Sequence, residues 1–265
     1  MRKTGFIYLI IFTAGIYLIY RIPNTHHNDR LSCKMKEAKL SKIPMIKTAL
    51  ASYPGSGNTW IRHLIQQATG IATGSIYCEK MMQKTFIGEC VDNTSTIVIK
   101  THDSQHTSKY QRAVIVVRSP FRCLGSQFNL RNTLNQTGVA SGKAYQKYFK
   151  PFVDFWLPTW RTFYQEWMNK FGGPKYIMFY DNLKKDIEEE TRKLMKFLGV
   201  KYDENDFQCM LQNYEGPAHR TSRKKKDILP YFSPKQFNQI VNDILHIEQI
   251  AAKLNGQYHK IELYV

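Results

Sequence analysis

Short runs of β-forming residues alternate with longer helical patterns along the chain, and this alternation restricts the possible folds more than any other feature. The β-rich runs are residues 46–52, 97–100, 113–118 and 175–180. The helical patterns are residues 58–68, 120–131, 143–170, 186–198 and 234–254. Apolar strands joined by helices are typical of βαβ units, whose parallel sheet is buried on both faces. The sequence therefore predicts a three-layer α/β fold with a central parallel sheet flanked by helices.

The net charge indicates an anionic partner without identifying it. The chain has 265 residues, enough for one α/β domain with a sizeable core, and carries a formal net charge of +17. Nucleic acid, anionic lipid headgroups, anionic nucleotides and anionic glycans would all be attracted by such an excess. A solvated basic surface without a partner is the alternative. The partner therefore has to be inferred from motifs.

An uncharged run, residues 4–20, lies near the N-terminus between Lys3 and Arg21. Its length suits a helix that spans the thinner membranes of the early secretory pathway. No small-residue cleavage pattern follows it, so an uncleaved signal anchor is favoured over a secretory signal peptide. We expect a single-pass type II membrane protein with a cytosolic tail (1–3), a transmembrane signal anchor (4–20), a stem (21–44) and a lumenal domain (45–265).

Two features agree with a lumenal domain. Asn93 and Asn135 each begin a glycosylation sequon, Asn-Thr-Ser and Asn-Gln-Thr respectively. Cys78 and Cys90 lie 12 residues apart in a segment rich in turn residues, a spacing that suits a disulfide in an oxidising compartment. The chain has five cysteines, so at least one is unpaired or pairs with another chain. Five buried thiols are the alternative.

The segment between the first predicted strand and the first predicted helix, residues 53–60, has the composition of a phosphate-binding loop. It reads Tyr-Pro-Gly-Ser-Gly-Asn-Thr-Trp. Its small and hydroxyl residues allow backbone N–H groups to converge on an anion at the helix N-terminus. It is not a Walker A loop, because no Gly-Lys-Ser/Thr closes it. A tight strand-to-helix turn would explain the small residues equally well.

This loop resembles the Tyr-Pro-Lys-Ser-Gly-Thr-Thr-Trp loop of the sulfotransferases that use 3′-phosphoadenosine 5′-phosphosulfate (PAPS). The resemblance implies a P-loop-like fold in which the loop surrounds the 5′-phosphosulfate and its Trp stacks on adenine. The residues so implied are Gly55, Ser56, Gly57, Asn58, Thr59 and Trp60. The loop Lys that stabilises the leaving phosphate in cytosolic relatives is replaced by Gly55 in this chain.

A second motif, Lys100-Thr101-His102, ends the second predicted strand and resembles the family's Lys-Thr-His. The resemblance implies that His102 is the catalytic base, and an alcohol needs such a base before it becomes a good nucleophile. Lys100 and His102 are two residues apart on a strand, so they share one face. Because Gly55 leaves the loop without a cation, Lys100 is our candidate for the group that meets the charge on the leaving oxygen.

Further motifs resemble the family's sites for the 3′-phosphate and adenine. The family binds the 3′-phosphate with an Arg at a strand end and a Ser eight positions later, and Arg118 and Ser126 have that spacing. Tyr180 ends a strand where the family's Tyr reaches the adenine side. The run Arg223, Lys224 and Lys225 lies where the family has Arg-Lys-Gly closing over the 3′-phosphate, with Lys225 in place of the Gly.

The resemblance covers residues 46–255 and is strongest to the WSC-domain-containing sulfotransferases, Golgi enzymes implicated in sulfating sialylated glycans; we expect no WSC domain in this chain. It implies transfer of a sulfuryl group from PAPS to a hydroxyl of a glycan or glycoconjugate, sialylated acceptors included, at the lumenal side of the Golgi membrane. No metal and no nucleic-acid partner are implied. The alternatives are a membrane-anchored pseudoenzyme that binds PAPS or polyanions, suggested by Gly55 and the charge, and a nucleotide kinase, which the missing Gly-Lys-Ser/Thr argues against.

Overall fold

The computed structural model describes residues 33–34, 36–135, 137–216, 227–256 and 259–262. The predicted tail and anchor, most of the predicted stem and the basic run 223–225 lie outside the described residues. Cys33–Val265 forms one compact unit. Within the described ranges, no helix combines the length and apolar character that a bilayer span needs.

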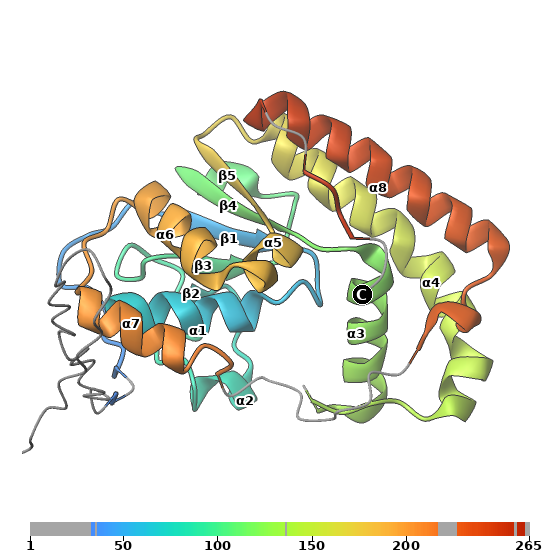
Figure 1. The fold of residues 1–265 in the computed structure, drawn as a ribbon, viewed down its shortest axis with the longest axis horizontal. Coiled ribbons are helices and arrows are strands. Elements are labelled where there is room, and N and C mark those ends of the chain that lie inside the picture. The colour runs from blue at the N-terminus through green and yellow to red at the C-terminus, as the bar shows by residue number, and fades with distance from the viewer. Residues whose placement is uncertain (1–32, 35, 136, 217–226, 257–258, 263–265) are drawn as a thin grey trace, which may run out of the picture. The chain divides into compact units, whose positions relative to one another are not determined.

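A five-stranded parallel sheet forms the centre of this unit (Figure 1). Its strands are β1 (Thr48–Ser52), β2 (Gly74–Ser75), β3 (Ile99–Thr101), β4 (Arg112–Val117) and β5 (Lys175–Phe179). They lie in the order β2-β3-β1-β4-β5, and all four neighbouring pairs are parallel. The parallel sheet expected from the sequence is therefore present. The two-residue strand β2 was not predicted, because it is too short to show a pattern.

Helices cover both faces of the sheet, since alternate residues of each buried strand point to opposite sides. Ala49, Ala51, Ile115 and Val117 contribute to a core with the helices α3 (Pro120–Thr133), α4 (Gly142–Gln165) and α8 (Pro234–Asn255). Leu50, Val114, Val116 and Met178 contribute to a second core with the helices α1 (Asn58–Thr69), α6 (Ile187–Leu198) and α7 (Glu204–Gln212). The helices therefore form one layer on each side of the sheet.

Several elements differ from the sequence-based expectation. The helix expected over 143–170 is α4 followed by a π-helical turn, Glu166–Lys170. The strand β5 was expected to end at Tyr180 but ends at Phe179. Tyr180 instead begins a short helix, α5 (Tyr180–Lys185), which precedes α6. The short helix α2 (Lys80–Gln83) and α7 were not predicted. Short helices give too few turns for a clear apolar period, which explains both omissions.

Part of the predicted stem belongs to the folded unit. Cys33 forms a disulfide with Cys209 of α7, and Lys36 pairs with Asp206 of the same helix. The backbone N–H of Lys39 donates to the oxygen of Gly70, and its own oxygen accepts from Ala72. The described residues between Cys33 and position 44, which were expected to form a stem, therefore include residues that pack on the domain. A polar, basic composition cannot reveal a partner that is 176 residues away in the sequence.

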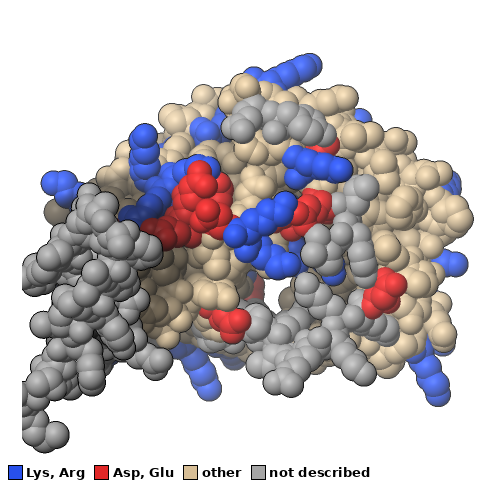
Figure 2. All heavy atoms as spheres, in the orientation of Figure 1, with Lys and Arg blue, Asp and Glu red and all other residues tan. Residues whose placement is uncertain are grey.

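Both glycosylation sequons lie at the surface. Asn93 and Asn135 are exposed. In each, the asparagine Oδ1 accepts hydrogen bonds from the backbone N–H and the hydroxyl of the residue two positions later, Ser95 or Thr137. On the face drawn in Figure 2, the described Lys and Arg side chains are spread among acidic and neutral residues and form no continuous basic stripe.

Candidate active site

The loop Tyr53–Gly57 connects the carboxyl end of β1 to α1, where parallel α/β sheets usually bind ligands. Gly55 and Gly57 both have left-handed backbone, with φ +84° and +91°, which glycine adopts without strain. A Cβ added at Gly55 would lie 2.6 Å from the backbone oxygen of Cys123. A Cβ added at Gly57 would collide with the ring of Tyr180. The loop therefore needs glycine at both positions for space as well as for conformation.

Two loop side chains implied as phosphate ligands make their hydrogen bonds inside the protein. The buried Ser56 hydroxyl lies 3.2 Å from the sulfur of Cys123 and 3.3 Å from the hydroxyl of Tyr164. The buried Asn58 amide donates to the backbone oxygen of Leu50 (3.0 Å) and to the hydroxyl of Ser52 (3.1 Å). The Ser56 side chain thus connects the loop to α3 and α4, and the Asn58 side chain connects it to β1. The ligand roles that the resemblance implies for these two residues stay predictions.

The N-terminus of α1 supplies the donors that remain at this loop. The first hydrogen bonds of the helix run from the N–H groups of Trp60 and Ile61 to the oxygen of Gly57. The N–H groups of Asn58 and Thr59 lie before these bonds in the chain and take no part in them. No side chain caps this end of α1. Uncapped N–H groups at a helix N-terminus favour an anion, because the helix dipole adds to their positive charge.

Arg118 follows β4 and joins the loop to α5. Its Nη1 donates to the backbone oxygen of Gly55 at 2.8 Å, and its guanidinium lies 4.1 Å from the ring centroid of Tyr180. The buried Nε of Arg118 has no acceptor among the described residues. Buried donors are almost always paired in native proteins. A guanidinium with an unused donor fits a phosphate oxygen at this position.

The other residues expected around the nucleotide gather beside Arg118. Ser126 lies on α3, with its Cβ 3.2 Å from a Cβ built at Gly55. The rings of Trp60 and Tyr180 meet edge to face, with centroids 5.5 Å apart. The indole N–H of Trp60 donates to the backbone oxygen of Tyr214 at 2.6 Å. The fold thus brings Trp60, Arg118, Ser126 and Tyr180 to one end of the sheet from four separate segments, whereas Arg223, Lys224 and Lys225 lie outside the described residues.

His102 lies just beyond β3, and its ring makes a hydrogen bond through one nitrogen and stacks on Tyr77 through one face. Its Nδ1 is 2.6 Å from the backbone oxygen of Ser52, and its ring stacks on Tyr77 with centroids 5.5 Å apart. A carbonyl oxygen can only accept, so Nδ1 carries the proton and Nε2 is left with a free lone pair. Burial and the positive charge of Lys100 lower the pKa of His102 to about 4. The imidazole is therefore a neutral proton acceptor at physiological pH.

Lys100 shares this edge of the sheet with His102, but its charge already has a partner. Its Nζ donates to Oε1 of Glu79 at 2.8 Å, and the Lys100 side chain is only 5% exposed, against 44% for Glu79. We expected Lys100 to supply the cation that the loop lacks. To stabilise a leaving phosphate, Lys100 would have to act while paired with Glu79 or break that ion pair.

Tyr77 and Glu79 are site residues that the motifs did not identify. They flank Cys78, which forms a disulfide with Cys90. The spacing of the two cysteines pointed to this disulfide, and it was the one signal that could have drawn attention to the neighbours of Cys78.

Cys123 is free and buried, and its sulfur contacts the loop through Ser56. Within the described ranges, no three His, Cys, Asp or Glu side chains come together as a metal site.

Comparisons with known proteins agree with this geometry. The sequence profile of the family described as "Sulfotransferase domain" matches residues 46–230. WSCD family member GA21586 of Drosophila pseudoobscura pseudoobscura is 39% identical over 193 residues, which are 70% of this chain and 60% of that protein. WSCD family member AAEL009094 of Aedes aegypti is 37% identical over 202 residues, which are 73% of this chain and 62% of that protein. The chain thus spans less than two thirds of these relatives' length.

A solved structure shows the same fold. The crystal structure of mouse sulfotransferase SULT7A1, complexed with PAP, superposes with a TM-score of 0.52 and 16% sequence identity, covering 81% of this chain and 87% of that one. At this identity the likeness concerns the fold alone. The family profile, however, matches well over half of the chain. The protein belongs to the sulfotransferase domain family.

Proposed function

We propose that this protein transfers a sulfuryl group from PAPS to a hydroxyl of a glycan or glycoconjugate. The observation that carries the proposal is the 2.6 Å contact between Nδ1 of His102 and the backbone oxygen of Ser52, from which we infer the tautomer of His102. Its Nδ1 proton is committed to the oxygen of Ser52, which leaves Nε2 free to take a proton from an acceptor hydroxyl. A neutral imidazole at the carboxyl edge of the sheet, beside an uncapped helix N-terminus, suits an alcohol nucleophile and an anionic donor.

The donor site in this proposal is the loop with its surroundings. The N–H groups of Asn58 and Thr59 would hold the 5′-phosphosulfate at the start of α1. Arg118 and Ser126 would hold the 3′-phosphate, and the unused Nε of Arg118 is the support for this assignment. Trp60 and Tyr180 would contact adenine. That PAP occupies the mouse SULT7A1 crystal structure makes an adenosine phosphosulfate donor the natural first choice.

The reaction follows from these groups. His102 Nε2 accepts the hydroxyl proton while the hydroxyl oxygen bonds to sulfur, and the sulfur–oxygen bond to the 5′-phosphate breaks. The leaving phosphate oxygen gains negative charge, which the helix N-terminus and Lys100 would stabilise.

We further propose that the domain works on the lumenal side of the Golgi membrane, anchored by residues 4–20. Two disulfides, Cys33–Cys209 and Cys78–Cys90, suit an oxidising compartment. The exposed asparagines of both sequons are accessible to glycosylation.

The decisive test uses the full-length protein with radiolabelled PAPS and an array of glycan acceptors. We expect label on a subset of glycans, and about 10²-fold less with His102→Ala protein purified in the same way. A protein that binds PAP but labels no hydroxyl acceptor would favour the pseudoenzyme alternative.

A further inference from the structure

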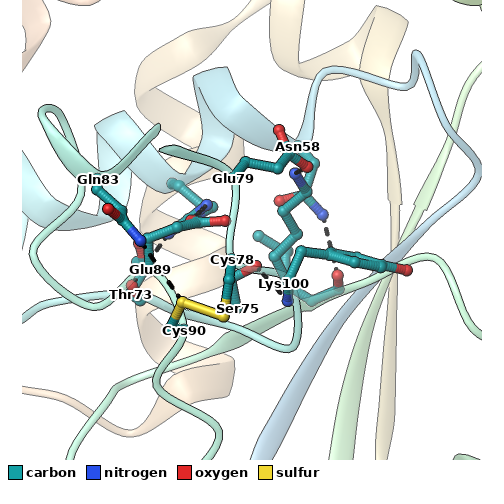
Figure 3. Close-up of polar contacts among 12 residues, drawn as sticks. Asn58, Thr73, Ser75, Cys78, Glu79, Gln83, Glu89, Cys90 and Lys100 are labelled. Carbon is teal, nitrogen blue, oxygen red and sulfur yellow. Dashed lines mark hydrogen bonds and ion pairs between the residues drawn. A yellow bond between two sulfur atoms is a disulfide. The ribbon is translucent and has the colours of Figure 1, made fainter. Parts of the chain in front are cut away.

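The connection between β2 and β3 runs along the catalytic edge of the sheet as two neighbouring segments. The N–H of Ile76 donates to the oxygen of Lys100 at 3.2 Å, which continues the β2–β3 ladder. The N–H of Cys90 then donates to the oxygen of Tyr77 at 3.0 Å. The disulfide between the exposed Cys78 and Cys90 links the two segments (Figure 3). We call Tyr77–Glu79, with Glu89 and Cys90, the clamp.

One side of the clamp contacts both proposed catalytic residues. The hydroxyl of Tyr77 accepts a hydrogen bond from the backbone N–H of His102 at 3.0 Å, in addition to the ring stacking. Glu79 holds the Nζ of Lys100, which also lies 5.3 Å from the Tyr77 ring centroid. An ammonium as buried as that of Lys100 is stable only with a counter-ion, so Glu79 decides where this charge lies.

The other side of the clamp is anchored in the core. Glu89, next to Cys90, pairs with Arg62 of α1 at 2.8 Å, and both side chains are fully buried. Arg62 also donates to the hydroxyl and the backbone oxygen of Thr73 and lies over the ring of Phe86. The segment with Cys90 is thus fastened to the helix whose N-terminus forms the phosphate loop. The disulfide connects this anchored segment to the segment that contains Cys78 and Glu79 (Figure 3).

We propose that Tyr77 and Glu79 are positioning residues for His102 and Lys100, and that the Cys78–Cys90 disulfide makes their position rigid by joining them to the Arg62–Glu89 pair. This inference rests on the proposed sulfuryl transfer. Its consequence is that the chemical step depends on an exposed disulfide, whereas donor binding, made by the loop, Arg118 and the aromatic residues, does not. A small displacement of a catalytic group costs rate even when ligands still bind.

The test compares three variants of the full-length protein: Cys78→Ser with Cys90→Ser, Glu79→Ala, and Glu79→Gln. We expect the first two to lower kcat by about tenfold or more while the Kd for PAP changes less than about twofold. Glu79→Gln keeps an oxygen for the Lys100 hydrogen bond, so it should recover part of the rate lost in Glu79→Ala.

The matched control is Cys33→Ser with Cys209→Ser, which removes the other disulfide, far along the chain from the clamp. We expect this variant to keep the wild-type kcat. Equal losses of kcat in both cysteine variants, or a parallel loss of PAP affinity in the clamp variants, would overturn the inference, because either would show a general effect on folding.

A readout without catalysis separates this inference from the proposed function. Nitrogen NMR of ¹⁵N-labelled histidine, with His102 assigned through His102→Ala, reports which ring nitrogen is protonated. We expect the Nδ1–H tautomer of the wild type to lose population in the clamp cysteine variant and in Tyr77→Phe. Unchanged spectra would contradict the inference even if the enzyme is active. If wild-type protein sulfates nothing but these spectra change, the proposed function fails and the positioning role stands.

Discussion

The Nδ1 atom of His102 lies 2.6 Å from the backbone oxygen of Ser52, so a residue at the end of β1 selects the tautomer of a residue at the end of β3. These strands are neighbours in the sheet. The hydrogen bond commits one ring nitrogen and leaves the other to accept a proton.

We expect His102→Ala to lower kcat by about 10²-fold or more, the usual size of a general-base contribution, while the Kd for PAP stays close to that of the wild type. Single-turnover sulfate transfer and calorimetric PAP titration measure the two quantities. His63→Ala is a useful comparison, because His63 bonds to the backbone oxygen of Asn213 and not to the loop. Undiminished transfer by His102→Ala would rule out His102 as the base.

The pH dependence of activity should reflect a weakly basic His102. Burial is the largest cause of the lowered pKa, and Lys100 on β3 and Arg62 on α1 add to it. The hydrogen bond to Ser52 and the charge of Glu79 act in the opposite direction, and the resulting pKa of His102 is about 4. We therefore expect kcat/KM to stay level below neutral pH and to fall only as pH approaches 4. A break near 6.5, the ordinary value for histidine, would contradict this.

The same shift predicts how stability depends on pH. The unfolded chain, with an ordinary histidine pKa of 6.5, binds the proton before the folded protein does. The contribution of a neutral His102 is present in full above pH 6.5 and is lost as pH falls toward 4. We expect the free energy of unfolding of the wild type to fall over this range relative to His102→Gln, in urea titrations at several pH values.

Arg118→Ala should weaken PAP binding by about 2 kcal/mol or more, the scale of a lost charged hydrogen bond. It should weaken 5′-AMP binding far less, because 5′-AMP has no 3′-phosphate. The contact of Arg118 with the oxygen of Gly55 adds a small loss for both ligands. Competition titrations with the two nucleotides measure the difference. Equal losses would mean that Arg118 only supports the loop.

Gly55→Ala should destabilise the protein more than Gly199→Ala. Both glycines have positive φ, so each substitution costs about 1 kcal/mol in backbone strain. Only at position 55 does the added Cβ also approach a backbone oxygen, that of Cys123, whereas a Cβ at Gly199 meets nothing within 4 Å. Thermal unfolding of the two variants gives the comparison.

The added Cβ at position 55 would also distort the loop, so Gly55→Lys should not restore the activity lost in Lys100→Ala. A restored rate would show that the loop can rearrange.

Both sequons should carry glycans if the domain is lumenal. Protein made in animal cells should lose mass on endoglycosidase treatment, and Asn93→Gln and Asn135→Gln should each remove part of that loss, because both asparagines are exposed. The protein should also sediment with membranes. A soluble protein of unmodified mass would contradict the lumenal assignment.

The sequence by itself determined the features that depend on neighbouring residues. Strand and helix periods gave the parallel sheet and its flanking helices, and the motifs placed Gly57, His102, Arg118 and Tyr180 at one end of it. Local patterns suffice here because parallel strands joined by helices must end on the same edge. The disulfide between Cys78 and Cys90 could also be predicted from the sequence, because the two cysteines are only 12 residues apart in the chain.

Only the tertiary structure decided which atoms meet across long stretches of chain. The hydroxyl of Ser56 contacts Tyr164 of α4, Lys100 pairs with Glu79, and Cys33 pairs with Cys209. A motif gives the residue type that a site needs, but the direction of a side chain depends on the packing around it. The path between β2 and β3 has no periodic pattern. The contacts of Tyr77 and Glu79 therefore arise from the packing of this segment against β3 and α1, which no local signal describes.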